Sequence, residues 1–207
     1  QGDEWCDEVM LRGLDERIAR LPAERRARGV VVFMHQMGSH GPAYYLRSPA
    51  RFKRFTPECT TNALQQCARE QVVNAYDNTI AYTDHFLAST IDWLQTREAQ
   101  WAPALVYVSD HGESLGERGI YLHGLPKLIA PAEQTRIPLL LWMSAGARER
   151  LGVDTIKLLE RASRSASPYH LFPTLLDLFD VRARIYDQNA DLLGTVRDRS
   201  PELVGPR

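Results

Sequence analysis

The sequence predicts an α/β layered fold with a largely parallel sheet. Short apolar, β-rich runs at residues 30–34, 105–108 and 137–143 are typical of buried strands. Segments with apolar residues at three- and four-residue steps alternate with these runs and indicate amphipathic helices. Helices that alternate with strands pack on the faces of a sheet, and 207 residues are enough for one domain with a sizeable core.

The helical patterns differ in length along the chain. The longest pattern covers residues 62–97 and precedes the strand at 105–108. Pro138 limits the start of the last strand, because proline cannot donate a hydrogen bond to a ladder. Residues 124–134 and the tail from 187 are expected to be loops. The helices are expected at residues 7–28, 62–97, 147–151, 155–161 and 168–181.

The composition is that of an ordinary soluble globular protein. Hydrophobic residues make up 44% of the chain, and 25 Lys and Arg against 26 Asp and Glu give a net charge of −1. This balance does not indicate nucleic-acid binding. The longest apolar run, Ile137 to Met143, is too short to span a bilayer. The chain opens at Gln1 in mid-pattern and without a signal peptide, so the natural protein is expected to start upstream.

One segment at the end of a predicted strand combines two carboxylates with an imidazole. Asp110, His111 and Glu113 follow the strand at 105–108, and Gly112 among them permits a tight turn. Sites in open α/β sheets are built outside the carboxyl ends of strands. The oxygen of Asp110 and the nitrogen of His111 are a ligand pair that suits Zn²⁺ or Mn²⁺. The alternative interpretation is a polar surface loop, because Asp and Gly are common in turns.

Two further histidines stand in glycine-flanked loops. His40 follows the strand predicted at 30–34, and His123 precedes Gly124. If these two converge with Asp110 and His111, the four form a metal and phosphate site. Zinc would supply a Lewis acid there, and histidines that do not bind it could contact phosphate oxygens or protonate a leaving group. The motif Gly-x-Ser-x-Gly is absent, which argues against an α/β-hydrolase.

Two other features leave alternatives open. Cys59 and Cys67 flank a small polar loop, and their spacing suits either a local disulfide or two free thiols. Cys6 is then left over, as a buried thiol or as one half of a bridge to a segment outside this chain. Residues 44–55 are basic and aromatic, which fits a solvated loop or contact with a phosphate.

Several motifs together carry a resemblance to one known family. The motif Val-Ser-Asp-His-Gly-Glu-Ser-Leu-Gly-Glu at 108–117 is followed by Tyr-Leu-His-Gly at 121–124. The resemblance continues in His-Gln-Met-Gly-Ser-His-Gly-Pro-Ala-Tyr-Tyr at 35–45, and in Cys-Asp-Glu-Val at 6–9. It also covers Phe-Thr-Pro at 55–57 and Asn-Ala-Tyr-Asp-Asn at 74–78. Over about residues 4–143 the chain thus resembles the phosphoethanolamine–lipid A transferases. These belong to the sulfatase and alkaline phosphatase superfamily and include mobile colistin-resistance enzymes.

The resemblance implies a role for each motif residue. Asp110 and His111 would be zinc ligands, and His40 and His123 would be catalytic residues that bind the transferred phosphate or a second zinc. Glu113 would bind substrate, support the ligands or serve as an auxiliary ligand. The fold would be part of a three-layer α/β/α sandwich with a mainly parallel central sheet, as in alkaline phosphatase and the sulfatases. The cysteines at 59 and 67 would form a disulfide in the oxidising periplasm.

The resemblance also implies a two-step reaction and a longer protein. In the family, a threonine takes phosphoethanolamine from phosphatidylethanolamine, and the phosphothreonine passes the group to lipid A, which confers polymyxin and colistin resistance. That threonine, a zinc-binding glutamate and the membrane helices lie upstream of the segment that matches residues 6–9. Residues 1–207 would therefore be the C-terminal portion of a catalytic domain at the periplasmic face of the inner membrane, inactive when alone.

One departure from the family and two competing interpretations remain. Members often carry Ser-His-Asp-Asn-Leu-Phe-His where this chain has Ser-Pro-Tyr-His-Leu-Phe-Pro at 167–173, so His170 is expected to serve the start of a helix. The first competing interpretation is another sulfatase-superfamily enzyme, either a hydrolase or a phosphoglycerol transferase. The second is a non-catalytic domain that binds a metal.

Overall fold

The computed structural model describes residues 7–197 and divides the chain into two compact units. Within the described residues the first unit comprises 7–92 and 111–137, and the second comprises 93–110 and 138–197. No helix in this part of the chain is both long and apolar enough to cross a bilayer. Cys6 lies outside the described residues.

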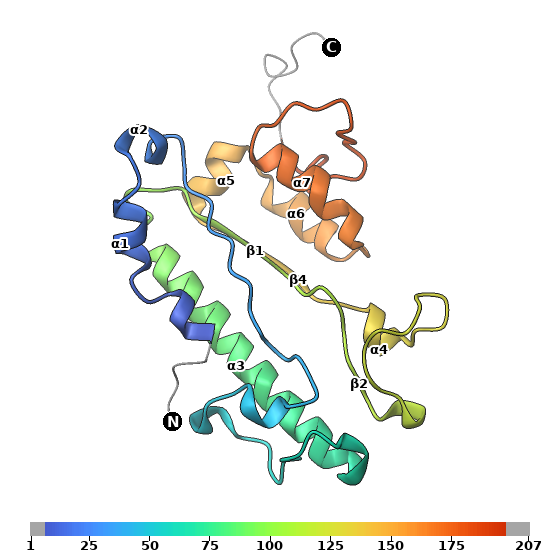
Figure 1. Ribbon diagram of the computed structural model, residues 1–207. Helices are drawn as coiled ribbons and strands as arrows, with labels where there is room; N and C mark the ends of the chain where they lie inside the picture. Colours follow the sequence, from blue (N-terminus) through green and yellow to red (C-terminus); the bar gives the residue numbers. More distant parts are fainter. Residues whose placement is uncertain (1–6, 198–207) are drawn as a thin grey trace. The chain divides into compact units, whose positions relative to one another are not determined.

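The first unit is organised around residues 69–92 of one long helix, α3 (Arg69–Gln95), which stands out in Figure 1. Val72, Ala75, Tyr82 and Phe86 recur at helical spacing and are all buried. The helix begins later than the predicted residue 62, because residues 62–68 hold the 3₁₀ turn η5 (Leu64–Gln66) and the end of a disulfide-closed loop. A disulfide joins the cysteines at 59 and 67, whose Cα atoms are 5.8 Å apart.

Residues 7–28 do not form the single helix that their periodicity predicts. The segment divides into η2 (Asp7–Met10), α1 (Leu14–Ala19) and α2 (Ala23–Arg26). Gly13 adopts a left-handed conformation with φ 63°, which ends the first turn. Pro22 stands before α2 and has no N–H to continue α1.

The strand predicted at 30–34 is wrong for this structure. Residues 29–37 have no strand or helix assignment, and Phe33 is 83% exposed. A strand exists only when a neighbour accepts and donates its backbone hydrogen bonds, and the described residues offer this segment no such partner in a ladder. The segment is instead held at its end by Asp7, whose carboxylate accepts from the backbone N–H groups of Met37 at 3.1 Å and Gly38 at 3.2 Å.

The other two predicted strands are confirmed and form a pair in the second unit. β1 (Ala104–Val108) pairs with β4 (Leu139–Met143), with Ala104 opposite Met143. The pair is antiparallel, so the largely parallel arrangement is not found in the described part of the chain. The physical reason lies in the connection. Parallel neighbours need a crossover, usually a long helix, and the residues between β1 and β4 contain only a small hairpin and short helices.

The remaining helices of the second unit follow the predicted order. They are α5 (Ala145–Leu151), α6 (Thr155–Ala162), η7 (Pro168–His170) and α7 (Leu171–Leu178). The last helix therefore ends before the predicted Val181. The carboxylate of Asp154 caps α6 by accepting from the N–H groups of Ile156 and Lys157. The core of this unit contains Met143, Ala147, Leu193 and Val196.

A small hairpin in the first unit carries the segment that the sequence singles out. β2 (Ser114–Leu115) and β3 (Tyr121–Leu122) pair antiparallel. Residues 124–134 are mostly loop, as predicted, and end in the single turn α4 (Ala132–Thr135). Gly112 lies directly against this turn, because its N–H donates to the carbonyl of Gln134 at 3.0 Å. A Cβ at position 112 would lie only 2.1 Å from the carbonyl oxygen of Glu133.

We predict that Gly112→Ala destabilises the chain by about 1–3 kcal/mol, because the new methyl group meets backbone that cannot move aside cheaply. Urea unfolding followed by circular dichroism measures the change. Gly146→Ala is the matched control, since its Cβ would meet its nearest neighbour at an ordinary 3.9 Å within α5. Alanine there should leave stability unchanged or raise it by up to about 1 kcal/mol. Equal stability of the two variants would contradict the close approach at Gly112.

Candidate metal and phosphate site

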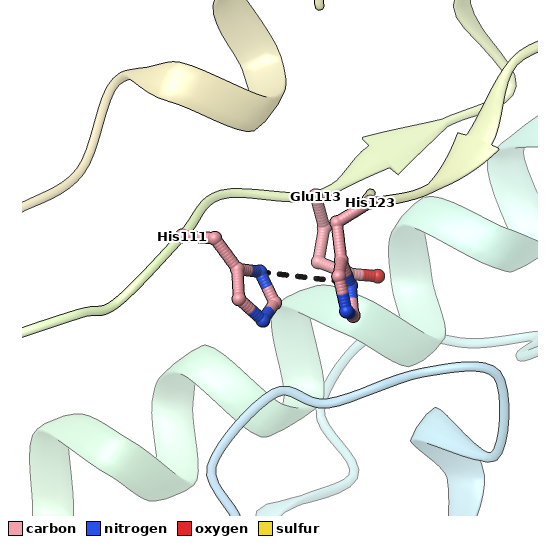
Figure 2. A group of neighbouring side chains, drawn as sticks. All are labelled: His111, Glu113 and His123. Carbon is pink, nitrogen blue, oxygen red and sulfur yellow. Dashed lines mark hydrogen bonds and ion pairs between the residues drawn. The ribbon is translucent and has the colours of Figure 1, made fainter. Parts of the chain in front are cut away.

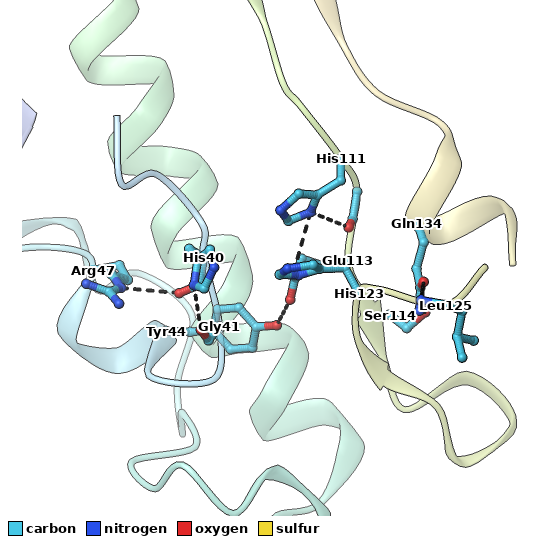
Figure 3. Close-up of polar contacts among 11 residues, drawn as sticks. His40, Gly41, Tyr44, Arg47, His111, Glu113, Ser114, His123, Leu125 and Gln134 are labelled. Atoms are coloured by element: carbon cyan, nitrogen blue, oxygen red, sulfur yellow. Dashed lines mark hydrogen bonds and ion pairs between the residues drawn. The ribbon is translucent and has the colours of Figure 1, made fainter. Parts of the chain in front are cut away.

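The three predicted site histidines all lie together in the first unit (Figure 3). His40 follows the extended segment 29–37, His111 lies between β1 and β2 in the sequence, and His123 directly follows β3. The rings of His111 and His123 stack, with centroids 3.6 Å apart and planes 28° apart. The ring of His40 meets the other two edge-on, at 5.3 Å from His123 and 6.2 Å from His111.

A buried carboxylate lies next to the imidazoles of His111 and His123. The side chain of Glu113 is 3% exposed. Its Oε1 accepts a hydrogen bond from Nδ1 of His123 and lies 3.7 Å from Nδ1 of His111. Its Oε2 accepts a hydrogen bond from the hydroxyl of Tyr44, a residue with no exposed surface (Figure 3). Burial, followed by the hydrogen bond to Glu113 and its charge, raises the pKa of Tyr44 far above its usual value, so the phenol remains protonated.

The hydrogen bonds of the three rings define their neutral tautomers. Nδ1–H of His40 donates to the carbonyl of Gly41 at 2.7 Å, and Nδ1–H of His111 donates to the carbonyl of Gly112 at 2.9 Å. A carbonyl oxygen can only accept, so the proton must lie on the ring nitrogen. Nδ1–H of His123 donates in the same way to the carboxylate. In each neutral ring the lone pair therefore lies on Nε2, the atom that would bind a metal or accept a proton.

His111, Glu113 and His123 form a group able to hold a metal ion, because each offers a ligand atom within 4.8 Å of the others (Figure 2). Imidazole nitrogen suits Zn²⁺ better than Mg²⁺ or Ca²⁺, which take oxygen ligands. Two ligands of one tetrahedral zinc lie about 3.3 Å apart when each bond is near 2.05 Å. Glu113 and His123 approach more closely than this, in a direct hydrogen bond. The arrangement thus fits zinc on imidazole nitrogen, with Glu113 as the hydrogen-bond partner of His123.

Asp110 is the one predicted site residue that belongs to the second unit. It is exposed and lies in a bend after β1. The other predicted site residues belong to the first unit. The metal-capable group found among the described residues does not include Asp110. Its proposed role as a ligand therefore rests on the family motif alone.

The basic and aromatic stretch contributes mainly to structure. Arg51 pairs with Glu8 at 2.6 Å, and Lys53 pairs with Glu58 at 2.6 Å. For these two cations, the ion pairs support a structural role. They do not support contact with a phosphate, which was one interpretation of residues 44–55. Arg47 is the member next to the site, because its Nε donates to the carbonyl of His40 at 3.2 Å.

The role of His170 was predicted from the sequence, whereas that of Tyr44 was not. His170 serves the start of a helix, as predicted, because its Nδ1 accepts from the backbone N–H of Ser167 at 3.1 Å in a capping box. Tyr44 is the functional candidate that sequence reasoning missed. Its position four residues after His40 was the available signal, but nothing in the pattern distinguishes its buried phenol from that of Tyr45.

Comparisons with known proteins identify the family of the chain. The sulfatase family model matches residues 3–181. The phosphoethanolamine transferase EptA of Escherichia coli K12 is 46% identical over 94% of this chain, which covers 35% of EptA. The phosphatidylethanolamine transferase Mcr-2 of Escherichia coli is 40% identical over 96% of this chain, which covers 32% of Mcr-2. The chain thus spans about a third of the length of these relatives.

Solved structures show the same relationship. The soluble domain of lipooligosaccharide phosphoethanolamine transferase A from Neisseria meningitidis superposes with a TM-score of 0.86 at 38% identity, over 94% of this chain and 57% of that one. A zinc complex of the periplasmic domain of EptC from Escherichia coli superposes with a TM-score of 0.59 at 26% identity, over 75% and 42%. These matches confirm the resemblance seen in the motifs: the chain belongs to the sulfatase family, and the members that it matches are phosphoethanolamine transferases.

Proposed function

We propose that the whole protein transfers phosphoethanolamine from phosphatidylethanolamine to a phosphate of lipid A in a zinc-dependent reaction, and so confers resistance to polymyxin and colistin. The observation that carries this proposal is the meeting of three imidazoles, one of them hydrogen-bonded to a buried glutamate, in a chain 46% identical to a phosphoethanolamine transferase. A sulfatase fold alone hosts several chemistries, so the assignment rests on the site and the identity together.

Each side chain has a defined task in this proposal. His111 and Asp110 would hold zinc, which supplies a Lewis acid that offsets the charge of phosphate oxygens. His40 and His123 would direct Nε2 toward the phosphoryl group. In the protonated state they donate hydrogen bonds to its oxygens, and in the neutral state they accept a proton from the incoming group. The side chain of His123 is 30% exposed, so a ligand can reach it.

The remaining parts of the whole protein are also proposals. The 207 residues would be the C-terminal portion of a catalytic domain with a three-layer α/β/α sandwich. A threonine upstream would accept phosphoethanolamine as a phosphothreonine, and membrane helices farther upstream would hold the domain at the periplasmic face of the inner membrane. The disulfide of Cys59 and Cys67 supports an oxidising compartment.

Zinc titration tests the position of the metal site. We predict that His111→Ala and Asp110→Ala each lower the zinc affinity of the chain by well over tenfold, since even outer-shell changes at zinc sites cost about 10- to 100-fold. Isothermal calorimetry measures the affinities. His35→Ala is the matched control, because this exposed histidine precedes the site in the same segment and should bind zinc as the unmodified chain does. Unchanged affinity in both site variants would place the metal elsewhere.

The proposed position of the threonine, upstream of these 207 residues, leads to a separate prediction. We expect no release of diacylglycerol above blank when the purified 207-residue chain is incubated with zinc and a fluorescent phosphatidylethanolamine, because the proposed threonine acceptor would lie upstream of this chain. The full-length protein should release diacylglycerol under the same conditions. Turnover by the chain alone would show that its own residues include the nucleophile.

A further inference from the structure

We propose that Tyr44 is a positioning residue that acts through Glu113: its hydroxyl orients the carboxylate, and the carboxylate sets the tautomer of His123 that presents Nε2 to the phosphoryl group. The catalytic consequence rests on the proposed function, whereas the hydrogen-bond chain itself does not. The chain consists of two hydrogen bonds. One joins the hydroxyl of Tyr44 to Oε2 of Glu113, and the other joins Oε1 of Glu113 to Nδ1 of His123 (Figure 3).

The chain of hydrogen bonds is buried at one end and open at the other. Tyr44 has no exposed surface and Glu113 is 8% exposed as a residue. Among the described residues, the only hydrogen-bond partner of the Tyr44 hydroxyl is Glu113. Nε2 of His123 has no hydrogen-bond partner within the same described part of the chain. The buried residues are therefore fully committed to one another, and the exposed ring nitrogen is the one left for a ligand.

The surrounding structure leaves Tyr44 little freedom to move. Its ring meets the ring of Tyr76 edge-on at 5.5 Å and packs in the core with Val72 and Ala75 of α3. Gly41 also lies against the phenol, because a Cβ at this position would be 2.6 Å from the Tyr44 oxygen and 2.5 Å from Cδ2 of Leu122. Since β3 ends at Leu122, directly before His123, this packing ties the phenol to the segment that carries the imidazole.

The direction of each hydrogen bond follows from donor and acceptor chemistry. A protonated phenol whose only partner is a carboxylate must donate to it. The second oxygen of Glu113 accepts from Nδ1–H of His123. Both oxygens of the carboxylate accept hydrogen bonds. A Gln side chain differs, because it has one accepting oxygen and one donating nitrogen. Tyr44 would then claim the oxygen, and the amide nitrogen would face the ring.

The test is the tautomer of His123, read by ¹⁵N NMR of the two ring nitrogens in the chain. We expect the unmodified chain to hold the proton on Nδ1. In Glu113→Gln the amide nitrogen donates to Nδ1, so the proton should move to Nε2. In the double variant Glu113→Gln with Tyr44→Phe, the amide is released from the phenol and can turn its oxygen to the ring, which returns the proton to Nδ1.

Two outcomes would overturn the proposal. The first is an Nδ1–H tautomer in Glu113→Gln, and the second is an Nε2–H tautomer that persists in the double variant. Either result shows that Tyr44 does not orient residue 113 by donating to its oxygen, which is the proposed role. Tyr45→Phe in the Glu113→Gln background is the matched control. Tyr45 is the next residue of η3 (Tyr44–Leu46), and its hydroxyl makes no hydrogen bond to the described residues, so the Nε2–H tautomer should remain.

Activity of the full-length protein separates this inference from the proposed function. We expect Tyr44→Phe to lower kcat by about tenfold with little change in KM, as for supporting residues behind a site, while Tyr45→Phe leaves both unchanged. If the tautomers follow the pattern above but the full-length protein transfers no phosphoethanolamine, the positioning role stands and the transferase assignment fails. If transfer occurs and the tautomers do not respond, the assignment stands and the positioning role fails.

Discussion

The carboxylate of Glu113 is the constraint on which the site depends. A carboxylate removed from water is costly unless donors surround it, and here the phenol of Tyr44 and Nδ1 of His123 supply them. These two donors are 79 residues apart in the sequence. Hydrogen bonding to one buried carboxylate therefore holds the segment at 40–44 against the segment at 111–123. The same hydrogen bonds that remove this penalty also hold the imidazole that faces the solvent.

Several family motifs outside the site build the frame that makes this contact possible. Asn78 of α3 accepts from the backbone N–H of Phe55 at 2.9 Å and donates to its carbonyl at 3.0 Å, which attaches the segment after the histidine loop to the long helix. Asp7 receives the N–H groups that precede His40. Gly112 permits the approach of α4. Resemblance at such positions therefore reflects the packing that positions the imidazoles rather than chemistry.

The two units explain why a motif that is continuous in sequence serves different parts of the structure. The chain leaves the β1–β4 pair at Asp110 and enters the first unit at His111. The histidines that converge all belong to the first unit, and zinc chemistry is consistent with their nitrogen atoms. The carboxylate best placed among them is Glu113, which sequence reasoning ranked below Asp110, because motif order says nothing about which oxygen becomes buried.

The sequence by itself determined the elements and residues whose signals are local. The periodic helix α3, the apolar strands β1 and β4, and the loops of His40, His111 and His123 were all readable from spacing, glycine and family motifs. Only the tertiary structure decided how distant segments pair. It made β1 and β4 antiparallel, left residues 30–34 without a ladder, and selected the phenol at 44 over its neighbour. Backbone pairing and burial depend on what the rest of the chain brings alongside, and no local pattern contains that information.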